Sequence, residues 1–89
     1  MQKPAFTGQF KRDFKKSEAR GLDMAKLEKA MDLLLAAVPL PERYKDHPLR
    51  HNWKGFRELH IEPDWLLIYK IIGDVVLFSR TGTHSDLFG

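Results

Sequence analysis

Apolar side chains recur at helical spacing in the first part of the chain. Six of them follow the i, i+3, i+4, i+7, i+8, i+11 series that lines one face of a helix: Leu27, Ala30, Met31, Leu34, Leu35 and Val38. Residues 8–20 form an earlier segment of this kind, where phenylalanines recur every four residues and basic side chains occupy the other surfaces. Each pattern predicts an amphipathic helix, and the phenylalanine spacing is typical of core packing.

Capping residues set the ends of the two predicted helices. Thr7 is a good N-cap for the first helix and Gly21 a good C-cap, while Asp23 is a good N-cap for the second. Pro39 and Pro41 end the second helix, because proline and the residue before it disfavour helical backbone. The link between the helices is so short that we expect an antiparallel αα-hairpin.

The pattern changes to strand spacing in the second half of the chain. Predicted strands are joined by turns at Pro63 and at Gly73-Asp74, and they cover residues 55–61, 65–71 and 75–81. Residues 3–6 are a further short strand. The order β-α-α-β-β-β predicts an α+β fold, an antiparallel β-sheet meander with the N-terminal αα-hairpin packed on one face.

The whole chain, residues 1–89, is predicted to be one domain without a repeat or linker. Residues 42–54 show no sustained period and are interpreted as a charged, aromatic loop. Long loops inside small domains often carry function.

Composition narrows the function classes. The chain has no cysteine, which removes disulfides, thiolate metal sites and a cysteine nucleophile and fits a reducing compartment, the cytoplasm. It has no secretory signal and no apolar run near the ~20 residues of a membrane span, so no membrane partner is expected.

Basic residues are concentrated in one stretch, although the net charge is only +3. Residues 43–57 contain one acidic residue, Asp46, and five basic ones, Arg43, Lys45, Arg50, Lys54 and Arg57. Such a local excess beside histidines and aromatic residues favours a polyanion partner. The alternative is an ordinary solvated surface.

Histidines are the candidate proton-transfer groups, because only their ordinary pKa lies near physiological pH. His60 ends a predicted strand, sharing a face with Glu58, and Asp64 lies on the following turn. His47 lies in the basic loop, and His84 follows the last strand. Neighbouring antiparallel strands are expected to bring all three histidines to one edge of the sheet.

A zinc site is an alternative use of these histidines. His47 and His51 stand at i, i+4, but Pro48 between them argues against a continuous helix. No other metal-binding motif is present, so no metal is predicted. The chain also lacks a nucleophile elbow and a glycine-rich phosphate loop.

Aromatic residues offer surfaces for stacking on bases. Trp53 and Trp65 are both candidates, although Trp65 precedes an apolar run and is more readily explained as part of the core. Phe88, one residue from the end, gains little from core packing, so base stacking is a reasonable use for it.

Several motifs together resemble the YafQ branch of the RelE/ParE superfamily, the toxins of bacterial type II toxin–antitoxin systems. The similarity rests on four stretches of sequence: residues 44–49, 53–58, 60–70 and 80–88. It implies a small sheet covered by an N-terminal helical hairpin and an endoribonuclease that cuts mRNA in the ribosomal A site. It also implies a monomeric toxin that a cognate antitoxin neutralises within an oligomeric complex.

The resemblance also implies roles for individual residues. The motifs place the family's catalytic and RNA-contacting groups on His47, His60, Asp64, Arg80, His84 and Phe88. Glu58 matches a position that is acidic in only some relatives. ParE-like members inhibit a topoisomerase without cutting RNA and generally lack these histidines; such a non-catalytic toxin, or a plain RNA-binding module, is the alternative.

The expected reaction is RNA cleavage without a metal or other cofactor. A base removes the proton of a ribose 2′-hydroxyl, which attacks the adjacent phosphate, and an acid protonates the departing 5′-oxygen. The sequence does not assign the base and the acid among these histidines; the preferred assignment is His60 with Asp64 as the base side, His84 as the acid, and His47 on the phosphate. Arg80 stabilises the growing charge, and the five basic residues of the loop region hold the RNA and ribosomal RNA backbone.

Overall fold

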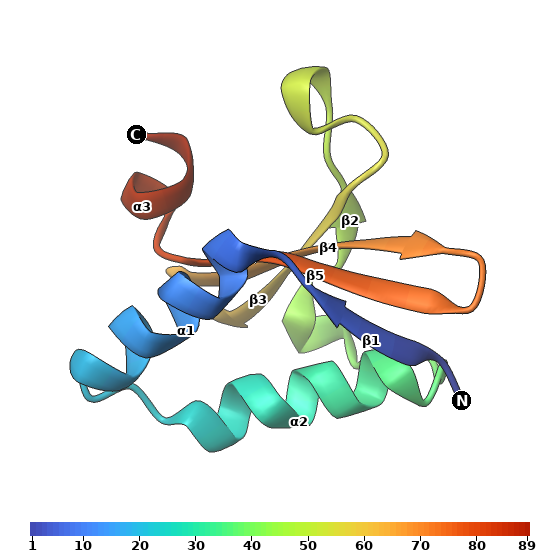
Figure 1. The fold of residues 1–89 in the computed structure, drawn as a ribbon, viewed down its shortest axis with the longest axis horizontal. Helices are drawn as coiled ribbons and strands as arrows, with labels where there is room; N and C mark the ends of the chain where they lie inside the picture. The colour runs from blue at the N-terminus through green and yellow to red at the C-terminus, as the bar shows by residue number, and fades with distance from the viewer.

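The computed structural model describes residues 1–89, which form a five-stranded sheet with two helices on one face (Figure 1). The elements follow in the order β1 (Lys3–Phe6), α1 (Gly8–Ala19), α2 (Met24–Leu35), η1 (Glu42–Tyr44), β2 (His47–Pro48), η2 (His51–Trp53), β3 (Arg57–Glu62), β4 (Trp65–Ile72), β5 (Val75–Gly82) and α3 (His84–Phe88). The η elements are 3₁₀ turns. The predicted α+β class and the N-terminal helical hairpin are confirmed.

The helix caps are those that the sequence indicates. Thr7 Oγ1 accepts a hydrogen bond from the Phe10 backbone N–H at 2.9 Å, and the Asp23 side chain caps α2. Gly21 adopts the left-handed conformation after α1, with φ +79°. Val38, the last position of the predicted stripe, lies beyond the end of α2 and is 45% exposed. Ala37 adopts left-handed backbone with φ +57° directly after the C-cap Ala36, which accounts for the earlier end.

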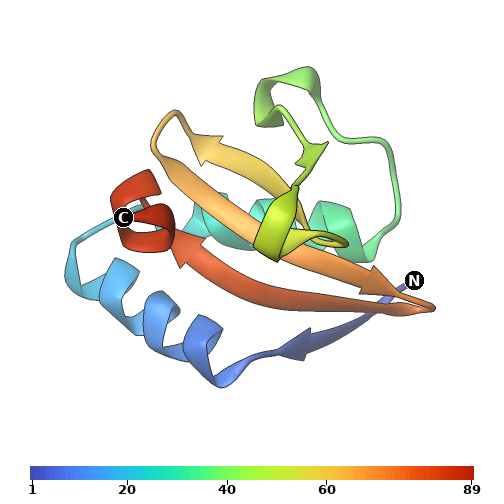
Figure 2. The same ribbon diagram turned by 90° about the horizontal axis from the view of Figure 1, so that it is seen from above.

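Strand order in the sheet is β1-β5-β4-β3-β2 (Figure 2). Strands β3, β4 and β5 form the predicted antiparallel meander, while β1 pairs with β5 in parallel, so the sheet is mixed. The prediction of a loop throughout residues 42–54 is wrong at His47–Pro48, which pairs with β3 as β2. Pairing covers part of the outer edge of β3, whose backbone groups would otherwise remain open.

The two faces of the sheet bury different groups. Toward the helices, side chains of β3, β4 and β5 pack on α1 and α2 and form the main core, with Leu59, Leu67, Tyr69 and Phe78. On the other face a smaller cluster of Leu66, Ile68 and Leu87 packs against Leu49, Trp53 and Phe56 of the loop region. This second face is therefore covered by the loop region and by α3, and it carries the candidate site.

Trp65 belongs to the main core and is only 3% exposed. Its indole N–H donates to Thr81 Oγ1 at 3.0 Å. Burial prevents it from stacking on a base, so the core interpretation of Trp65 holds.

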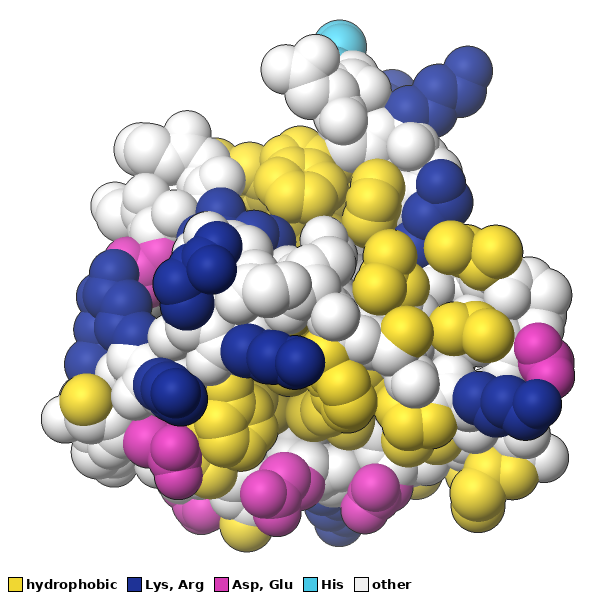
Figure 3. Space-filling view, viewed as in Figure 1, with side chains coloured by type: hydrophobic (Ala, Val, Ile, Leu, Met, Phe, Trp, Pro, Cys, Tyr) yellow, Lys and Arg dark blue, Asp and Glu magenta, His cyan; other side chains and the backbone are white.

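The phenylalanine series of the first helix is only partly buried. Phe10 is 2% exposed, whereas Phe6 is 43% exposed and lies with Phe14 and Met31 along a groove between α1 and α2. Figure 3 shows apolar side chains on this face between lysine and arginine side chains and acidic ones. None of the helices has the length and apolar character needed to cross a bilayer.

Candidate active site

Three histidines form a row on the face of the sheet opposite α1 and α2. His47 comes from β2, His60 from β3, and His84 is the first residue of α3. The ring centroids of His47 and His60 are 6.1 Å apart, and those of His60 and His84 are 5.9 Å apart. The expectation that neighbouring strands bring the three histidines together is met, with α3 supplying the third.

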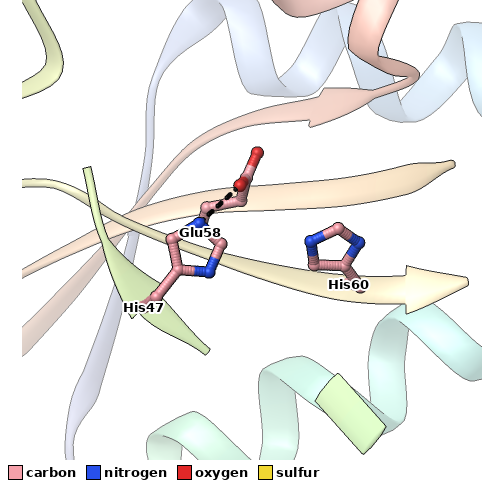
Figure 4. A group of neighbouring side chains, drawn as sticks. All are labelled: His47, Glu58 and His60. Atoms are coloured by element: carbon pink, nitrogen blue, oxygen red, sulfur yellow. Dashed lines mark ion pairs between the residues drawn. The ribbon is translucent and has the colours of Figure 1, made fainter. Parts of the chain in front are cut away.

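His47 is paired with the buried carboxylate of Glu58. The two residues are directly opposite each other in the pairing of β2 with β3, and His47 Nε2 lies 2.9 Å from Glu58 Oε2 (Figure 4). His47 Nδ1 donates to the Lys45 carbonyl at 2.7 Å. Because both ring nitrogens face oxygen acceptors, a fully protonated imidazolium satisfies every contact of this ring.

His60 has a different hydrogen-bond environment. Its Nδ1 donates to the Pro63 carbonyl at 3.3 Å, within the tight turn that joins β3 to β4. This bond places the ring proton on Nδ1 and leaves Nε2 with a free lone pair. His60 also lines a hollow of about 350 Å³ with Arg43 and Lys45. It is the one histidine of the three whose geometry suits a base.

His84 is bound to Asp64 through two hydrogen bonds. The His84 ring Nδ1 donates to Asp64 Oδ1 at 2.6 Å, and the His84 backbone N–H donates to the same oxygen at 2.9 Å. Both bonds favour the charged carboxylate, so the pKa of Asp64 lies below its ordinary value, with the backbone bond the larger cause. The bond to Asp64 Oδ1 occupies Nδ1 of the His84 ring and leaves Nε2 available.

The expectation that Asp64 assists His60 is therefore wrong, because Asp64 assists His84 instead. Leu66 pairs with Gly82 across β4 and β5, and this register continues outward to Asp64 on one strand and His84 on the other. The partner of Asp64 is thus decided by strand register, which single-sequence patterns do not fix.

A network around Asp86 holds α3 in place. Thr83 and Asp86 form a capping box, and Asp86 also accepts from the Arg20 guanidinium at 2.6 Å. These donors lower the pKa of Asp86 well below its ordinary range, the Arg20 bond most of all. A Cβ atom at Gly82 would lie 2.9 Å from Asp86 Oδ2, so the turn needs glycine. This support for His84 was not found from the sequence, because Arg20 lies 66 residues away.

Arg80 is anchored to α1. Its Nε donates to Asp13 Oδ2 at 2.8 Å, and the Thr81 backbone N–H donates to the same oxygen at 3.2 Å. Asp13 is only 6% exposed, and nothing in the sequence identified it as a partner of Arg80. Because this ion pair engages part of the guanidinium, the catalytic role of Arg80 stays a prediction.

The predicted RNA-binding residues fall into two groups. Four have exposed positions in and around the loop: Arg43, Lys45, Arg50 and Lys54. Arg57 differs, since its guanidinium is bound to Asp46 at 3.0 Å, and Asp46 also accepts from the Tyr69 hydroxyl. This pairing raises the pKa of Arg57 and holds its side chain against the protein beside β3.

An aromatic hollow lies beside the histidine row. Trp53 and Phe88 meet edge to face with their centroids 6.4 Å apart, and Phe88 is 46% exposed. Both line a hollow of about 410 Å³ that has Arg50 among its lining residues. Ring faces next to a cation can hold a base.

The i, i+4 pair His47 and His51 does not form a metal site, because the first lies in β2 and the second in η2. A different set has metal-ligand spacing: His47, Glu58 and His60 offer donor atoms that all lie within 4.8 Å of one another. Two imidazoles and a carboxylate are ligands that transition metals accept.

Comparison with known proteins gives a consistent result. Residues 2–89 match the family described as "Bacterial toxin of type II toxin-antitoxin system, YafQ". A curated relative, the mRNA interferase toxin YafQ of Escherichia coli strain B/BL21-DE3, is 52% identical over 85 residues, covering 94% of this chain and 92% of the relative.

Solved structures of similar proteins cover the whole chain. The structure titled as the E. coli DinJ-YafQ complex matches with a TM-score of 0.92 and 49% identity, over 100% of both chains. A structure titled as a metal-bound toxin from Helicobacter pylori matches with a TM-score of 0.93 and 38% identity, over 99% of this chain and 100% of the other.

Proposed function

The chain belongs to the YafQ family of bacterial type II toxin–antitoxin toxins, and we propose that it is an mRNA interferase that inhibits translation by cutting ribosome-bound message. The name of the E. coli relative supports the endoribonuclease activity. The observation that carries the proposal is the row of three histidines, each with a different partner for its Nδ1.

His60 is the general base in this proposal. Its Nε2 lone pair removes the proton from the ribose 2′-hydroxyl, and the resulting oxygen attacks the adjacent phosphorus. The Nδ1 bond to the Pro63 carbonyl supports this role because it holds the ring in the tautomer that a base requires.

His84 is the general acid. The bond between phosphorus and the 5′-oxygen breaks as His84 Nε2 donates a proton to that oxygen, leaving a 2′,3′-cyclic phosphate upstream and a 5′-hydroxyl downstream. The Asp64 carboxylate supports the assignment, because its bond to Nδ1 holds the ring in place and leaves Nε2 as the nitrogen that can reach the substrate.

His47 supplies positive charge rather than a proton. Both of its ring nitrogens face oxygen acceptors, the Lys45 carbonyl and Glu58, so in this proposal the ring acts as an imidazolium beside His60 and stabilises charge on the phosphate oxygens. Arg80 adds to this field through the guanidinium donors that Asp13 leaves free.

The exposed cations, Arg43, Lys45, Arg50 and Lys54, hold the RNA backbone and the ribosomal RNA in this proposal. Phe88 and Trp53 stack on a base displaced beside the cut phosphate. Translation takes place in the cytoplasm, so the toxin acts there.

The proposed protein partner is a cognate antitoxin. The E. coli relative has been solved as a complex with DinJ, which supports a partner of that kind for this chain. We propose that a monomeric toxin joins an oligomeric complex in which the antitoxin keeps it from the ribosome.

Alanine variants at the two proton-transfer residues test the function. In a cleavage assay on translating ribosomes, His60→Ala and His84→Ala should each lower the rate about 10²–10⁴-fold and relieve growth inhibition. Neither residue belongs to a hydrophobic core, so circular dichroism and the melting temperature should stay near those of the parent. Folded variants as active as the parent would refute the catalytic assignment.

A further inference from the structure

Arg80 lies on the histidine face because β5 contains one extra residue. In the pairing of β4 with β5, Tyr69 lies opposite Phe78. The next pair is Ile68 with Arg80, so Ser79 has no partner. Phe78 belongs to the main core under the helices, whereas Ile68 belongs to the cluster on the opposite face. In a regular strand Arg80 would share the face of Phe78, and the β-bulge at Ser79 turns it to the other face.

Strand pairing also places Arg80 in one row with two residues of the site. His47 is opposite Glu58 in the pairing of β2 with β3. Glu58 is opposite Ile68, and Ile68 is opposite Arg80. Directly opposed residues have their side chains on the same face of a sheet. Arg80 is therefore the β5 member of this row, and its side chain is 23% exposed, so a ligand on the histidine face has access to it.

Helix α1 holds the bulge from the edge of the sheet. The last residue of β1 pairs with Phe78, so beyond that point the edge of β5 is not paired with a strand. Helix α1 lies along this part of β5 (Figure 2), and the hydroxyl of its N-cap, Thr7, donates to the Ser79 carbonyl at 2.7 Å. The Asp13 carboxylate accepts from the Thr81 backbone N–H at 3.2 Å, in the position that a neighbouring strand would otherwise occupy.

Asp13 also holds one side of the Arg80 guanidinium. Its Oδ2 accepts from Arg80 Nε at 2.8 Å, and its Oδ1 accepts from Arg80 Nη2 at 3.3 Å. Gln9 Nε2 donates to the same Oδ1 at 3.0 Å, so the carboxylate is fixed from its own helix as well as from β5. These bonds use two of the five guanidinium N–H donors and leave three for a ligand.

We propose that Asp13 is a positioning residue for RNA cleavage, which acts by holding Arg80. This inference rests on the proposed function, in which Arg80 stabilises charge on the phosphate oxygens. A donor that is already in place needs no reorganisation when that charge develops, and a long arginine side chain without a partner would have to be ordered first. Stability alone is a weaker explanation, because a buried ion pair is often no more stabilising than apolar side chains of similar volume.

Kinetics of cleavage on translating ribosomes test the positioning role. Asp13→Asn keeps the size of the side chain and an oxygen for the Thr81 N–H, but it removes the charge that holds Arg80. We expect kcat to fall about 10–100-fold with KM nearly unchanged, since a misplacement of roughly 1 Å can cost about 10²-fold. Arg80→Ala should lower kcat about 10²–10³-fold, as the loss of a donor to a developing charge does.

The double variant separates positioning from a general loss of structure. When Arg80 is already alanine, Asp13→Asn should lower kcat no further, because the side chain that Asp13 holds is absent. The same fold loss in both backgrounds would overturn the inference. If Asp13→Asn fails to fold, Asp13→Glu decides by the same comparison, since it keeps the charge and moves the carboxylate by one methylene group.

Ser17→Ala is the matched control on the same helix. Ser17 is 2% exposed, and its hydroxyl donates to the Asp13 backbone carbonyl at 3.0 Å, away from Arg80. The variant removes a buried hydrogen bond from α1, so its melting temperature should fall while its kcat stays at the parent value. A fall in kcat as large as that of Asp13→Asn would overturn the inference.

Nuclear magnetic resonance of the arginine Nε–H groups gives a readout without activity. The parent should show an ordered Arg80 Nε–H that exchanges slowly with water, assigned by its loss in Arg80→Ala. Asp13→Asn should make this group mobile, whereas Ser17→Ala should not. A mobile Arg80 Nε–H in the parent would overturn the inference.

The two experiments also distinguish the inference from the proposed function. An inactive parent would overturn the proposed nuclease, while the resonance of Arg80 still decides whether Asp13 holds its side chain. An active parent with an equally active Arg80→Ala variant would overturn the positioning role and leave the histidine mechanism in place.

Discussion

At the scale of single residues, the proposed mechanism gives one residue type three different tasks. The three histidines differ chiefly in their hydrogen-bond partners. His47 has a backbone carbonyl at Nδ1 and a carboxylate at Nε2, His60 has only a backbone carbonyl at Nδ1, and His84 has only a carboxylate at Nδ1. Since these partners decide which nitrogen carries a proton, they are the reason for proposing His47 as the charge, His60 as the base and His84 as the acid.

The prediction at this scale concerns Phe88. Phe88→Ala should lower the cleavage rate on the ribosome about tenfold, because one base–aromatic stack is worth about 1–3 kcal/mol. Ribosome binding should change little, since the exposed cations supply most of it. Ile72→Ala is the control, an exposed apolar residue at the far end of β4, 51% exposed, whose loss should leave the rate unchanged. Equal rates for Phe88→Ala and the parent would remove base stacking from the mechanism.

At the scale of elements, α3 is the part that depends most on the rest of the fold. It has five residues, which is too short for a helix that is stable alone. The capping box and the ion pair from Arg20 hold it, and Leu87 anchors it on the face of the sheet. Catalytic geometry at its first residue therefore depends on contacts made from α1.

Asp86→Asn tests this dependence. At pH 7 the variant should lose about 0.5–1 kcal/mol in the free energy of unfolding, because the amide cannot form the ion pair with Arg20, and its cleavage rate should fall as α3 loosens. The pKa of Asp86 is depressed in the folded chain, so its contribution is full above the unfolded value of about 3.9 and is lost as pH falls through the folded value.

Urea unfolding from pH 7 to pH 3 measures the effect. The stability gap between parent and Asp86→Asn should narrow as pH falls below about 4. A gap that stays constant over this range would show that the Asp86 charge does not stabilise α3.

At the scale of the whole molecule, the site is an open surface on a small domain. His84 and Asp64 are exposed, so this face lacks a closed cavity that would hold RNA in position. Cleavage requires the 2′-hydroxyl in line with the departing oxygen, and fixing such a geometry can be worth roughly 7–11 kcal/mol in the best cases. A ribosome that splays the codon can supply part of this orientation.

Ribosome dependence follows from that geometry. We predict slow or absent cleavage of naked RNA and rapid cleavage of ribosome-bound mRNA, with a 2′,3′-cyclic phosphate or 3′-phosphate on the upstream fragment. Time courses of cleavage measure the two rates, and end-group analysis of the upstream fragment identifies the phosphate. Equal rates on the two substrates would refute ribosome assistance, and an upstream 3′-hydroxyl would refute attack by the 2′-hydroxyl.

Positive charge on the same surface should also set the rate at which the antitoxin associates with the toxin. Reversal of Arg43, Lys45, Arg50 and Lys54 to glutamate should slow association with an acidic antitoxin segment at low salt. The matched control is reversal of four cations on the helices: Lys11, Lys15, Lys26 and Lys29. Association rates that are equal for the two quadruple variants would exclude steering by the loop region.

The sequence by itself determined what depends on neighbours along the chain. Helical and strand periods, the caps Thr7 and Asp23, and the turns at Pro63 and Gly73 are local, so the element order could be predicted. The motifs that carry the family resemblance are likewise read directly from the chain, as is the set of three histidines.

Tertiary structure alone decided which groups meet. Strand register places Asp64 beside His84 and His47 opposite Glu58. The packing of α1 on the sheet places Asp13 beside Arg80. These partners lie from 11 to 67 residues apart, and no local pattern encodes their pairing. Register and packing emerge only when the whole sheet buries its two faces, and they therefore decide which partner each histidine has, on which the proposed assignment of base and acid rests.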